Sequence, residues 1–164
     1  MAAATHRRLP EAMAVYRIGD PAGSYPIYSV EGARRANGRW HRRGQQVIYA
    51  AQHYSTALLE KLVRYSGGLP KGQHYLRIEI PAGVTYEVVT AHSLSGWDAP
   101  SGRTARAFGA KWCDEGRSAI LIVPSVVSRM ENNVVINMRH KDAARIKVGL
   151  EEPVRWDERL FGRG

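Results

Sequence analysis

The spacing of apolar residues changes several times along the chain, and each change marks an expected element. Short runs that alternate between apolar and polar residues, or that are apolar throughout, predict β-strands where Gly or Pro interrupts the pattern. The expected strands are residues 14–18, 47–50, 74–80, 84–90, 119–123 and 134–137. The run 119–123 contains no polar residue, which predicts a strand buried on both faces.

Helical spacing replaces β-type spacing in three segments. Residues 55–65 predict the most regular helix, with Ser55 as its N-cap and residues 66–68 as its end. Four apolar residues are expected on its buried side: Leu58, Leu59, Leu62 and Val63. Residues 103–115 predict a second helix, and residues 141–146 predict a short third helix.

The order of these elements predicts a single α+β domain. Strands and helices are interspersed without the regular βαβ order of a doubly wound sheet. A chain of 164 residues is long enough to bury one core. Residues 1–12 are small, polar and aperiodic, so we interpret them as a flexible N-terminal leader and residues 13–164 as the domain.

The charge of the chain points to an anionic partner. It has 24 Lys and Arg against 15 Asp and Glu, a formal net charge of +9 and a pI of about 10.0. An excess of this size is common in nucleic-acid-binding proteins, but it also suits a site that holds phosphates. Five of the arginines fall within residues 31–43, where a solvated basic loop is the ordinary alternative.

Several protein classes are excluded by what the sequence lacks. It has no apolar run of the ~18 residues that a membrane-spanning helix needs, and no apolar stretch typical of a signal peptide near its start. The single cysteine, Cys113, cannot form an internal disulfide, so we expect a cytoplasmic protein with no membrane partner. Phosphate-binding loop motifs and metal-ligand spacings of His or Cys are absent, so we expect no metal.

Glu60 is the first candidate for chemistry. It lies between apolar residues of the expected helix 55–65, at the boundary of the buried side, where a side chain can point into a cleft. The alternative is an ordinary surface glutamate that pairs with Arg64 four residues further on. The periodicity leaves both interpretations open.

Six short pieces of sequence, in order, strongly resemble the RES domain, the toxin family of RES–Xre toxin–antitoxin pairs. The pieces are Tyr16-Arg17-Ile18, Gly38-Arg39-Trp40, Val47-Ile48-Tyr49-Ala50, Ala57-Leu58-Leu59-Glu60, Val123-Pro124-Ser125 and Ile136-Asn137. Together they span nearly the whole expected domain. The short spacing between Glu60 and Ser125 looks most similar to the ParT-like members of ParST pairs.

The resemblance implies both a fold and an activity. The fold is similar to ADP-ribosyltransferases of the diphtheria-toxin type, in which two small antiparallel or mixed sheets frame an NAD⁺ cleft and helices surround them. The implied activity cleaves the nicotinamide–ribose bond of NAD⁺, the co-substrate, and transfers ADP-ribose to a protein. In ParT-like members the acceptor is phosphoribosyl pyrophosphate synthetase. An NAD⁺ glycohydrolase or phosphorylase that depletes NAD⁺ is the alternative.

The toxin resemblance also implies a partner. A protein with this activity must be held silent, and a basic cleft is readily blocked by an acidic or carboxylate-terminated segment. We therefore expect an Xre/ParS-like antitoxin that occludes the active-site cleft. Nucleic acid would be contacted only indirectly, through the antitoxin.

Matching the family's motifs gives a set of site residues. Glu60 and Arg39 take the catalytic positions, and the residues expected to bind NAD⁺ are Arg17, Tyr28, Arg39, Tyr49, Ser125 and Asn137. Ser118 is an alternate for the family serine. The sequence departs from the family pattern at His41, where many relatives have Asn, and at Met138, where Pro is common.

These residue types suit the implied chemistry. Cleavage of the nicotinamide–ribose bond passes through an oxocarbenium-like transition state, which the carboxylate of Glu60 can stabilise. The planar fork of Arg39, together with Arg17, can bind a pyrophosphate in bidentate fashion. Tyr49 offers a ring face for nicotinamide and a hydroxyl for a ribose, and Ser125 offers a small hydrogen-bond donor at the end of a strand.

Two further hypotheses remain open from the sequence. A basic nucleic-acid-binding module would explain the charge, although no helix-turn-helix, zinc-finger or RNA-binding signature is present. An RNase-type toxin is permitted by His53, Glu60 and Arg39 but is not specified by them. The sequence also leaves open the oligomeric state and whether water, phosphate or a protein side chain receives ADP-ribose.

Overall fold

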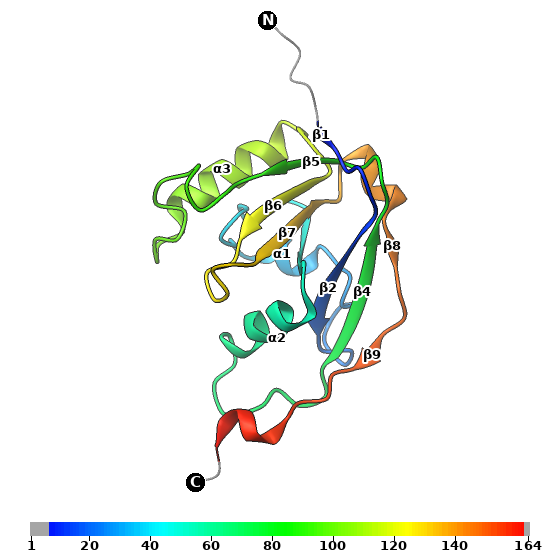
Figure 1. The fold of residues 1–164 in the computed structure, drawn as a ribbon, viewed down its shortest axis with the longest axis vertical. Helices are drawn as coiled ribbons and strands as arrows, with labels where there is room; N and C mark the ends of the chain where they lie inside the picture. The colour runs from blue at the N-terminus through cyan, green and yellow to red at the C-terminus, as the bar shows by residue number, and fades with distance from the viewer. Residues whose placement is uncertain (1–6, 163–164) are drawn as a thin grey trace, which may run out of the picture.

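Nine strands form one curled, mixed sheet in the computed structural model, which describes residues 7–162 (Figure 1). The strand order is β1-β5-β6-β7-β3-β2-β4-β8, and β9 pairs with β4. The strands are β1 (Arg7–Arg8), β2 (Met13–Gly19), β3 (Val47–Ala51), β4 (His74–Ile80), β5 (Thr85–Val88), β6 (Ile120–Pro124), β7 (Asn132–Asn137), β8 (Lys147–Val148) and β9 (Glu152–Pro153). All neighbouring strands are antiparallel except β5 and β6.

Helices lie around this sheet and complete the expected α+β class. They are α1 (Glu31–Arg35), α2 (Tyr54–Leu62), α3 (Arg103–Asp114) and the 3₁₀ helices η1 (Lys141–Arg145) and η2 (Glu158–Phe161). All six expected strands and the helices expected at 55–65 and 103–115 are confirmed, with small shifts at their ends. The expected third helix is the 3₁₀ turn η1. None of the described helices is long and apolar enough to cross a membrane.

The expected pair of small sheets is wrong in one respect, because hydrogen bonds join the two parts into one sheet. Strand β2 pairs with β4 along its full length, and β3 pairs with β7 along its full length. Between β2 and β3, by contrast, a single residue pair, Tyr16 and Ala51, joins the halves. We call these halves the β4 wing (β2, β4, β8, β9) and the β6 wing (β1, β5, β6, β7, β3).

The β6 wing is buried on both faces, as the apolar run 119–123 predicts. On one face, Ile120, Ile122 and Ile136 belong to a cluster that also includes Ile78 of the β4 wing. On the other face, Leu121 and its neighbours pack with the helix α3. Because side chains alternate along a strand, a continuous apolar run serves both clusters at once.

The described part of the expected leader is ordered. Residues Arg7 and Arg8 pair with Tyr86 and Thr85 at the edge of the sheet. Leu9 is only 8% exposed and belongs to the core. The expectation of a leader through residue 12 is therefore wrong for residues 7–12, because a two-residue strand followed by one apolar anchor gives no periodic signal. Residues 1–6 lie outside the described residues.

The helix α2 has the expected position but a different orientation. It begins at Tyr54 after His53, so the expected N-cap at Ser55 is wrong. Its buried residues are Thr56 and Ala57, whereas Leu58 and Leu62 of the expected apolar side are only half-buried. Leu59 is 43% exposed and Val63 is 62% exposed.

The side of α2 that faces the sheet is instead polar toward its C-terminal end. Four residues at helical spacing line a pocket between the helix and strands β2 and β3: Ala57, Glu60, Lys61 and Arg64. Small side chains in the first turn let the helix approach these strands closely, and the charged residues that follow occupy the space beyond. This arrangement points Glu60 inward.

Candidate functional site

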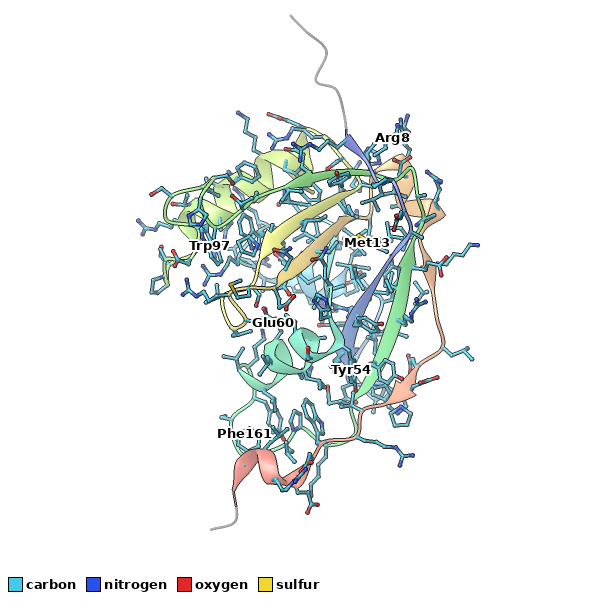
Figure 2. All side chains as sticks on the ribbon, viewed as in Figure 1. Arg8, Met13, Tyr54, Glu60, Trp97 and Phe161 are labelled. Atoms are coloured by element: carbon cyan, nitrogen blue, oxygen red, sulfur yellow. The ribbon has the colours of Figure 1, made fainter. Side chains whose placement is uncertain are left out.

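Two adjoining pockets lie where the two wings of the sheet meet, with Glu60 between them. Figure 2 shows Glu60 on α2, on the side that faces β6 and β7. The small pocket has a volume of about 200 Å³ and lies against β2 and α2. The large pocket has a volume of about 550 Å³ and extends along the loop of residues 36–41. Five residues line both: Arg17, Tyr49, Glu60, Arg64 and Asn133. The shared lining makes the two pockets one cleft.

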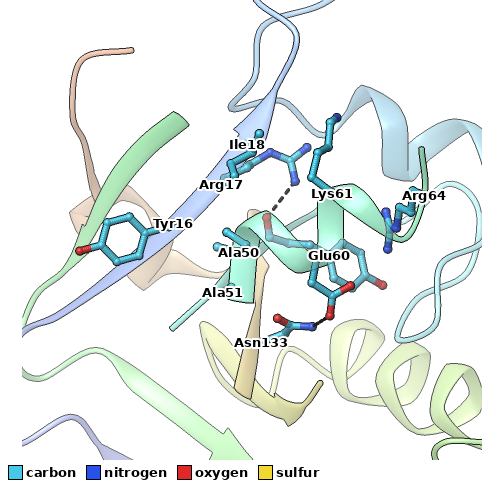
Figure 3. A pocket seen from close by; sticks show the side chains of 11 residues that line it. Tyr16, Arg17, Ile18, Ala50, Ala51, Glu60, Lys61, Arg64 and Asn133 are labelled. Carbon is cyan, nitrogen blue, oxygen red and sulfur yellow. Dashed lines mark hydrogen bonds between the residues drawn. The ribbon is translucent and has the colours of Figure 1, made fainter. Parts of the chain in front are cut away.

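Glu60 is held by one of its two carboxylate oxygens. The Ser125 hydroxyl donates to Oε1 at 2.9 Å, and the Asn133 side-chain amide donates to the same oxygen at 2.6 Å. Figure 3 shows the hydrogen bond from Asn133. Both donors converge on Oε1, so Oε2 accepts no hydrogen bond from the described residues. Glu60 forms no ion pair within residues 7–162, so the alternative of a surface pair with Arg64 is wrong.

The two candidate serines have different surroundings. Ser125 is fully buried and lines neither pocket; its hydroxyl donates to Glu60 and accepts from the backbone N–H of Ser128 at 3.1 Å. Ser118 accepts from the Trp112 indole N–H and donates to the carbonyl oxygen of Ile120, each at 2.8 Å. Ser125 therefore acts on the cleft through Glu60, whereas Ser118 satisfies polar groups in the core.

Tyr49 is fixed by a network that the sequence does not reveal. Its hydroxyl accepts from the backbone N–H of Trp40 at 3.1 Å and lies 2.7 Å from Nδ1 of His41. The other ring nitrogen of His41, Nε2, lies 3.0 Å from the carbonyl oxygens of Ala33 and Ala36. Carbonyl oxygens only accept, so Nε2 carries the proton and the Tyr49 hydroxyl donates to Nδ1.

This network determines what Tyr49 presents to the cleft. Burial lowers the pKa of His41 below its ordinary value of 6.5, which keeps the imidazole neutral at neutral pH. Burial raises the pKa of the Tyr49 hydroxyl, so it stays protonated. Because the hydroxyl is already engaged within the protein, Tyr49 offers its ring rather than its hydroxyl to a ligand.

Two glycines allow the loop of residues 38–41 to pack closely against Tyr49 and α3. A Cβ atom on Gly38 would lie 2.5 Å from the His41 ring and 2.6 Å from the Tyr49 hydroxyl. A Cβ atom on Gly109 of α3 would lie 1.9 Å from the carbonyl oxygen of Trp40. Only glycine fits at either position without displacement of the loop that carries Arg39.

The two arginines expected to bind pyrophosphate are both anchored. Arg17 donates through Nε to the carbonyl oxygen of Ile27 at 2.6 Å and through Nη1 to that of Tyr49 at 2.8 Å (Figure 3). Arg39 donates through Nη1 to the carbonyl oxygens of Trp97 and Ala99 at 3.0 and 2.9 Å. In each guanidinium Nη2 has no hydrogen-bond partner among residues 7–162, so both are oriented with donors to spare.

Besides the two serines, three more expected site residues do not line either pocket. Tyr28 donates to the Met138 sulfur at 3.5 Å and packs against the core. Asn137 is buried, and its side chain donates to the carbonyl oxygen of Cys113 and accepts from the backbone of a following residue. His53 is exposed and pairs with Glu131 at 2.7 Å. In this structure each has a partner elsewhere.

Asn133 is the cleft residue that the sequence interpretation missed. It lies on β7 opposite Ala51 and Val123, and it lines both pockets. Its Oδ1 atom is buried without a hydrogen-bond partner among the described residues. A polar residue on the same strand face as the buried Val135 was the available signal.

The described residues give no sign of metal or thiol chemistry in the cleft. No group of three His, Cys, Asp or Glu side chains suited to a metal occurs within residues 7–162. Burial raises the pKa of the Cys113 thiol to about 11, so it remains protonated and unreactive near neutral pH.

Comparison with known proteins places this cleft in context. Residues 14–157 match the model of the RES domain. The "Prs ADP-ribosylating toxin" of Sphingobium sp. (strain YBL2) is 39% identical over 153 residues, which cover 89% of this chain and 95% of that protein. The "Toxin Res" of Pseudomonas putida (strain KT2440) is 34% identical over 152 residues, which cover 91% of this chain and 100% of that protein.

A solved structure has the same fold. The chain aligns with a chain of the M. tuberculosis MbcT-MbcA toxin-antitoxin complex with a TM-score of 0.68 at 13% identity. The alignment covers 90% of this chain and 86% of the other. At this low identity the likeness establishes the fold alone.

Proposed function

The chain belongs to the family of RES domain toxins, and on that premise we propose that it cleaves the nicotinamide–ribose bond of NAD⁺ and transfers ADP-ribose to a protein. One observation carries the proposal. Glu60 sits on the wall shared by two pockets, with Oε1 fixed by two donors and Oε2 open. A carboxylate held in this way is suited to stabilise a cation that forms beside it.

The large pocket is the proposed NAD⁺ site. Its volume falls within the range of about 300–1,000 Å³ that ligand pockets span. The Tyr49 ring offers a surface for the nicotinamide ring, and Ala33, Ala36 and Trp40 add apolar lining to the same pocket. The unused Nη2 groups of Arg17 and Arg39 can donate to the pyrophosphate oxygens.

The proposed reaction uses Glu60 at the anomeric carbon. The bond between ribose C1 and the nicotinamide nitrogen breaks, and its electron pair leaves with neutral nicotinamide. The open Oε2 atom of Glu60 stabilises the oxocarbenium-like ribose. A lone pair of the acceptor then forms the new bond to C1, and the acceptor proton passes to Glu60 or to water.

The acceptor is proposed from the relatives. A relative with 39% identity is named for ADP-ribosylation of Prs, which supports a phosphoribosyl pyrophosphate synthetase as the protein acceptor. Transfer to water or phosphate, which would deplete NAD⁺, is the second candidate, because the cleft continues past Glu60 into the small pocket.

An antitoxin of the Xre/ParS type is the proposed partner, in the cytoplasm. The solved structural neighbour is a toxin–antitoxin complex, which supports a partner of this class. The exposed Val63 lines the large pocket, and the exposed Leu59 lies four residues before it on α2. An antitoxin segment that covers these residues would close the entrance to Glu60.

Glu60→Gln tests the proposal, with nicotinamide release and the mass of the acceptor as readouts. Wild-type protein incubated with NAD⁺ and the synthetase should release nicotinamide and add one ADP-ribose to the acceptor. The variant keeps the shape but loses the charge, so the rate should fall by about 10²–10³-fold. Glu79→Gln, an exposed glutamate on β4, is the matched control and should retain wild-type activity.

Two outcomes would reject the proposal. One is wild-type protein that neither releases nicotinamide nor modifies the acceptor. The other is a folded Glu60→Gln variant with undiminished activity, where the far-ultraviolet circular dichroism spectrum reports folding. Release of nicotinamide without an adduct on the acceptor would favour NAD⁺ depletion over protein modification.

A further inference from the structure

An ion pair outside both pockets lies next to the segment that anchors Arg39. Arg129, in the loop between β6 and β7, donates through Nη1 to Oδ2 of Asp98 at 2.7 Å. The guanidinium carbon of Arg129 also lies 5.6 Å from the centre of the Trp97 ring. Trp97, labelled in Figure 2, is only 4% exposed, so its ring is a fixed support for the arginine.

Asp98 belongs to the same three residues that hold Arg39. The carbonyl oxygens of Trp97 and Ala99, on either side of Asp98, both accept from Nη1 of Arg39. The hydrogen bond from Arg129 is the main reason why the pKa of Asp98 is lowered, and the nearby charge of Arg39 lowers it further. The Asp98 carboxylate is therefore within the electrostatic reach of the Arg39 guanidinium.

This carboxylate matters because of what Arg39 does in the proposed function. Nη2 of Arg39 is the donor proposed for the pyrophosphate of NAD⁺, and a carboxylate is an equally suitable acceptor for a guanidinium group. An unpaired Asp98 carboxylate would compete with the ligand for this donor. In the structure the carboxylate is paired with Arg129 instead.

We propose that Arg129 is a positioning residue for the NAD⁺ site, which acts by binding Asp98 so that this carboxylate does not compete with a dinucleotide pyrophosphate for Arg39. The inference rests on the proposed function. Arg129 and Asp98 line neither pocket, so both act on the ligand only through Arg39. Loss of the Arg129 charge should weaken binding of the ligand while the hydrogen bonds of Glu60 stay in place.

The alternative is an ordinary surface ion pair. The Arg129 side chain is 59% exposed and that of Asp98 is 40% exposed, and pairs as exposed as this one add little to stability. An ordinary pair would leave ligand affinity unchanged when either partner is replaced. The two interpretations therefore predict different ligand affinities in variants that are equally well folded.

Titration of ADP-ribose into the full chain tests the proposal, because ADP-ribose carries the pyrophosphate but has no nicotinamide bond to cleave. Isothermal titration should show that Arg129→Met binds at least threefold more weakly than wild type. Arg129→Lys keeps the charge and should stay within twofold of wild type. Cleavage of NAD⁺ by Arg129→Met should show the same change in KM with an unaltered kcat, because the ground state and the transition state lose the same interaction.

The double variant Asp98→Asn/Arg129→Met identifies the cause of the loss. It has no carboxylate left to compete for Arg39, so it should regain wild-type affinity for ADP-ribose. Arg103→Met is the matched control, because Arg103 is exposed, lies five residues after Asp98 and has no ion pair among the described residues. This control removes a nearby positive charge without freeing a carboxylate, and it should bind ADP-ribose within twofold of wild type.

Four results would overturn the inference: no binding of ADP-ribose to wild type, wild-type affinity in Arg129→Met, a double variant as weak as Arg129→Met, or an equal loss in Arg103→Met. Thermal unfolding of each variant reports its folding. If wild type and Arg129→Met cleave NAD⁺ with the same KM, the inference fails while the proposed function stands. The expected series of ADP-ribose affinities without any cleavage of NAD⁺ would support the inference and reject the proposed function.

Discussion

The cleft has two walls, and they differ in whether their polar side chains are hydrogen-bonded within the protein. Along the loop of residues 38–41, the polar side chains bond within the protein: His41 to Tyr49, and Arg39 to the segment of residues 97–99. Along α2, Lys61 and Oε2 of Glu60 are left open. The wall formed by the loop is fixed in shape, and the wall formed by α2 supplies charge that no protein group uses. Both features are expected of a preorganised site.

Gly109→Ala should give the largest effect, by breaking the fixed wall. The new Cβ would lie 1.9 Å from the Trp40 carbonyl oxygen, so the helix α3 or the loop must move. We expect a loss of about 3 kcal/mol in the free energy of unfolding, measured by urea denaturation. Ala107→Ser, at an exposed position on the same helix, should stay close to wild type. Equal stability of the two variants would show that the loop is not seated as tightly as described.

Asn133 tests how the open wall is held. Asn133→Ala removes a 2.6 Å hydrogen bond to the Glu60 carboxylate. Hydrogen bonds to charged groups contribute about 1.5–3 kcal/mol, so the turnover number should fall about 10–100-fold.

Asn133→Asp separates a positioning role from a merely structural one. A second carboxylate beside Glu60 makes the two groups share a proton, which should add an ionisation to the pH–rate profile that wild type lacks. A profile identical to wild type would argue that Asn133 does not position Glu60. The exposed Ala91→Asp, outside both pockets, is the control for added charge, and it should leave the pH–rate profile of NAD⁺ cleavage unaltered.

The two serines give a paired comparison of intermediate size. Ser125→Ala removes a donor to Glu60, so nicotinamide release should fall about tenfold while the protein stays folded. Ser118→Ala leaves the buried Trp112 indole N–H without its acceptor, so it should lower the unfolding free energy by about 1–3 kcal/mol with activity retained in the folded protein. Loss of activity in Ser118→Ala and loss of stability alone in Ser125→Ala would assign the cleft role to Ser118 and the core role to Ser125.

The smallest effect concerns the pH dependence of the fixed wall. The fold holds His41 neutral because burial lowers its pKa below 6.5. Below that pH the unfolded chain takes up a proton that the folded chain resists, so stability should fall as the pH drops. His41→Asn should reduce the difference in melting temperature between pH 7.5 and pH 5.5, whereas His92→Asn, at an exposed position, should not. An unchanged difference in His41→Asn would locate the acid sensitivity elsewhere.

Much of the fold was accessible from the sequence because local patterns determine it. The apolar run 119–123 and the alternation of 74–80 needed no knowledge of the rest of the chain. The short strands β1, β8 and β9 have two residues each and depend on neighbours that the pattern does not contain. The joining of the two wings into one sheet likewise depends on a single pair that no periodicity marks.

The orientation of α2 shows where local patterns fail. Leucines at helical spacing predict a buried side, but the helix lies on the sheet through Thr56 and Ala57 and turns its charges inward. The usual rule places the apolar side of a helix toward the protein. A helix that borders a cleft departs from this rule, because the polar groups of the cleft must face the protein interior. Matching motifs placed Glu60, Arg39 and the Tyr49 ring at the cleft, whereas no motif pointed to Asn133 or to the His41 tautomer.

The sheet is narrowest at the floor of the cleft, because a single residue pair joins β2 and β3 there. The β4 wing and the β6 wing each have long internal ladders, and between them only the pair of Tyr16 and Ala51 continues the backbone ladder. Arg17 on β2 adds a second link by donating to the Tyr49 carbonyl oxygen of β3, and one apolar cluster packs between the two wings. A substrate that contacts Arg17 on one wing and the Tyr49 ring on the other would therefore add contacts across the narrowest join in the sheet.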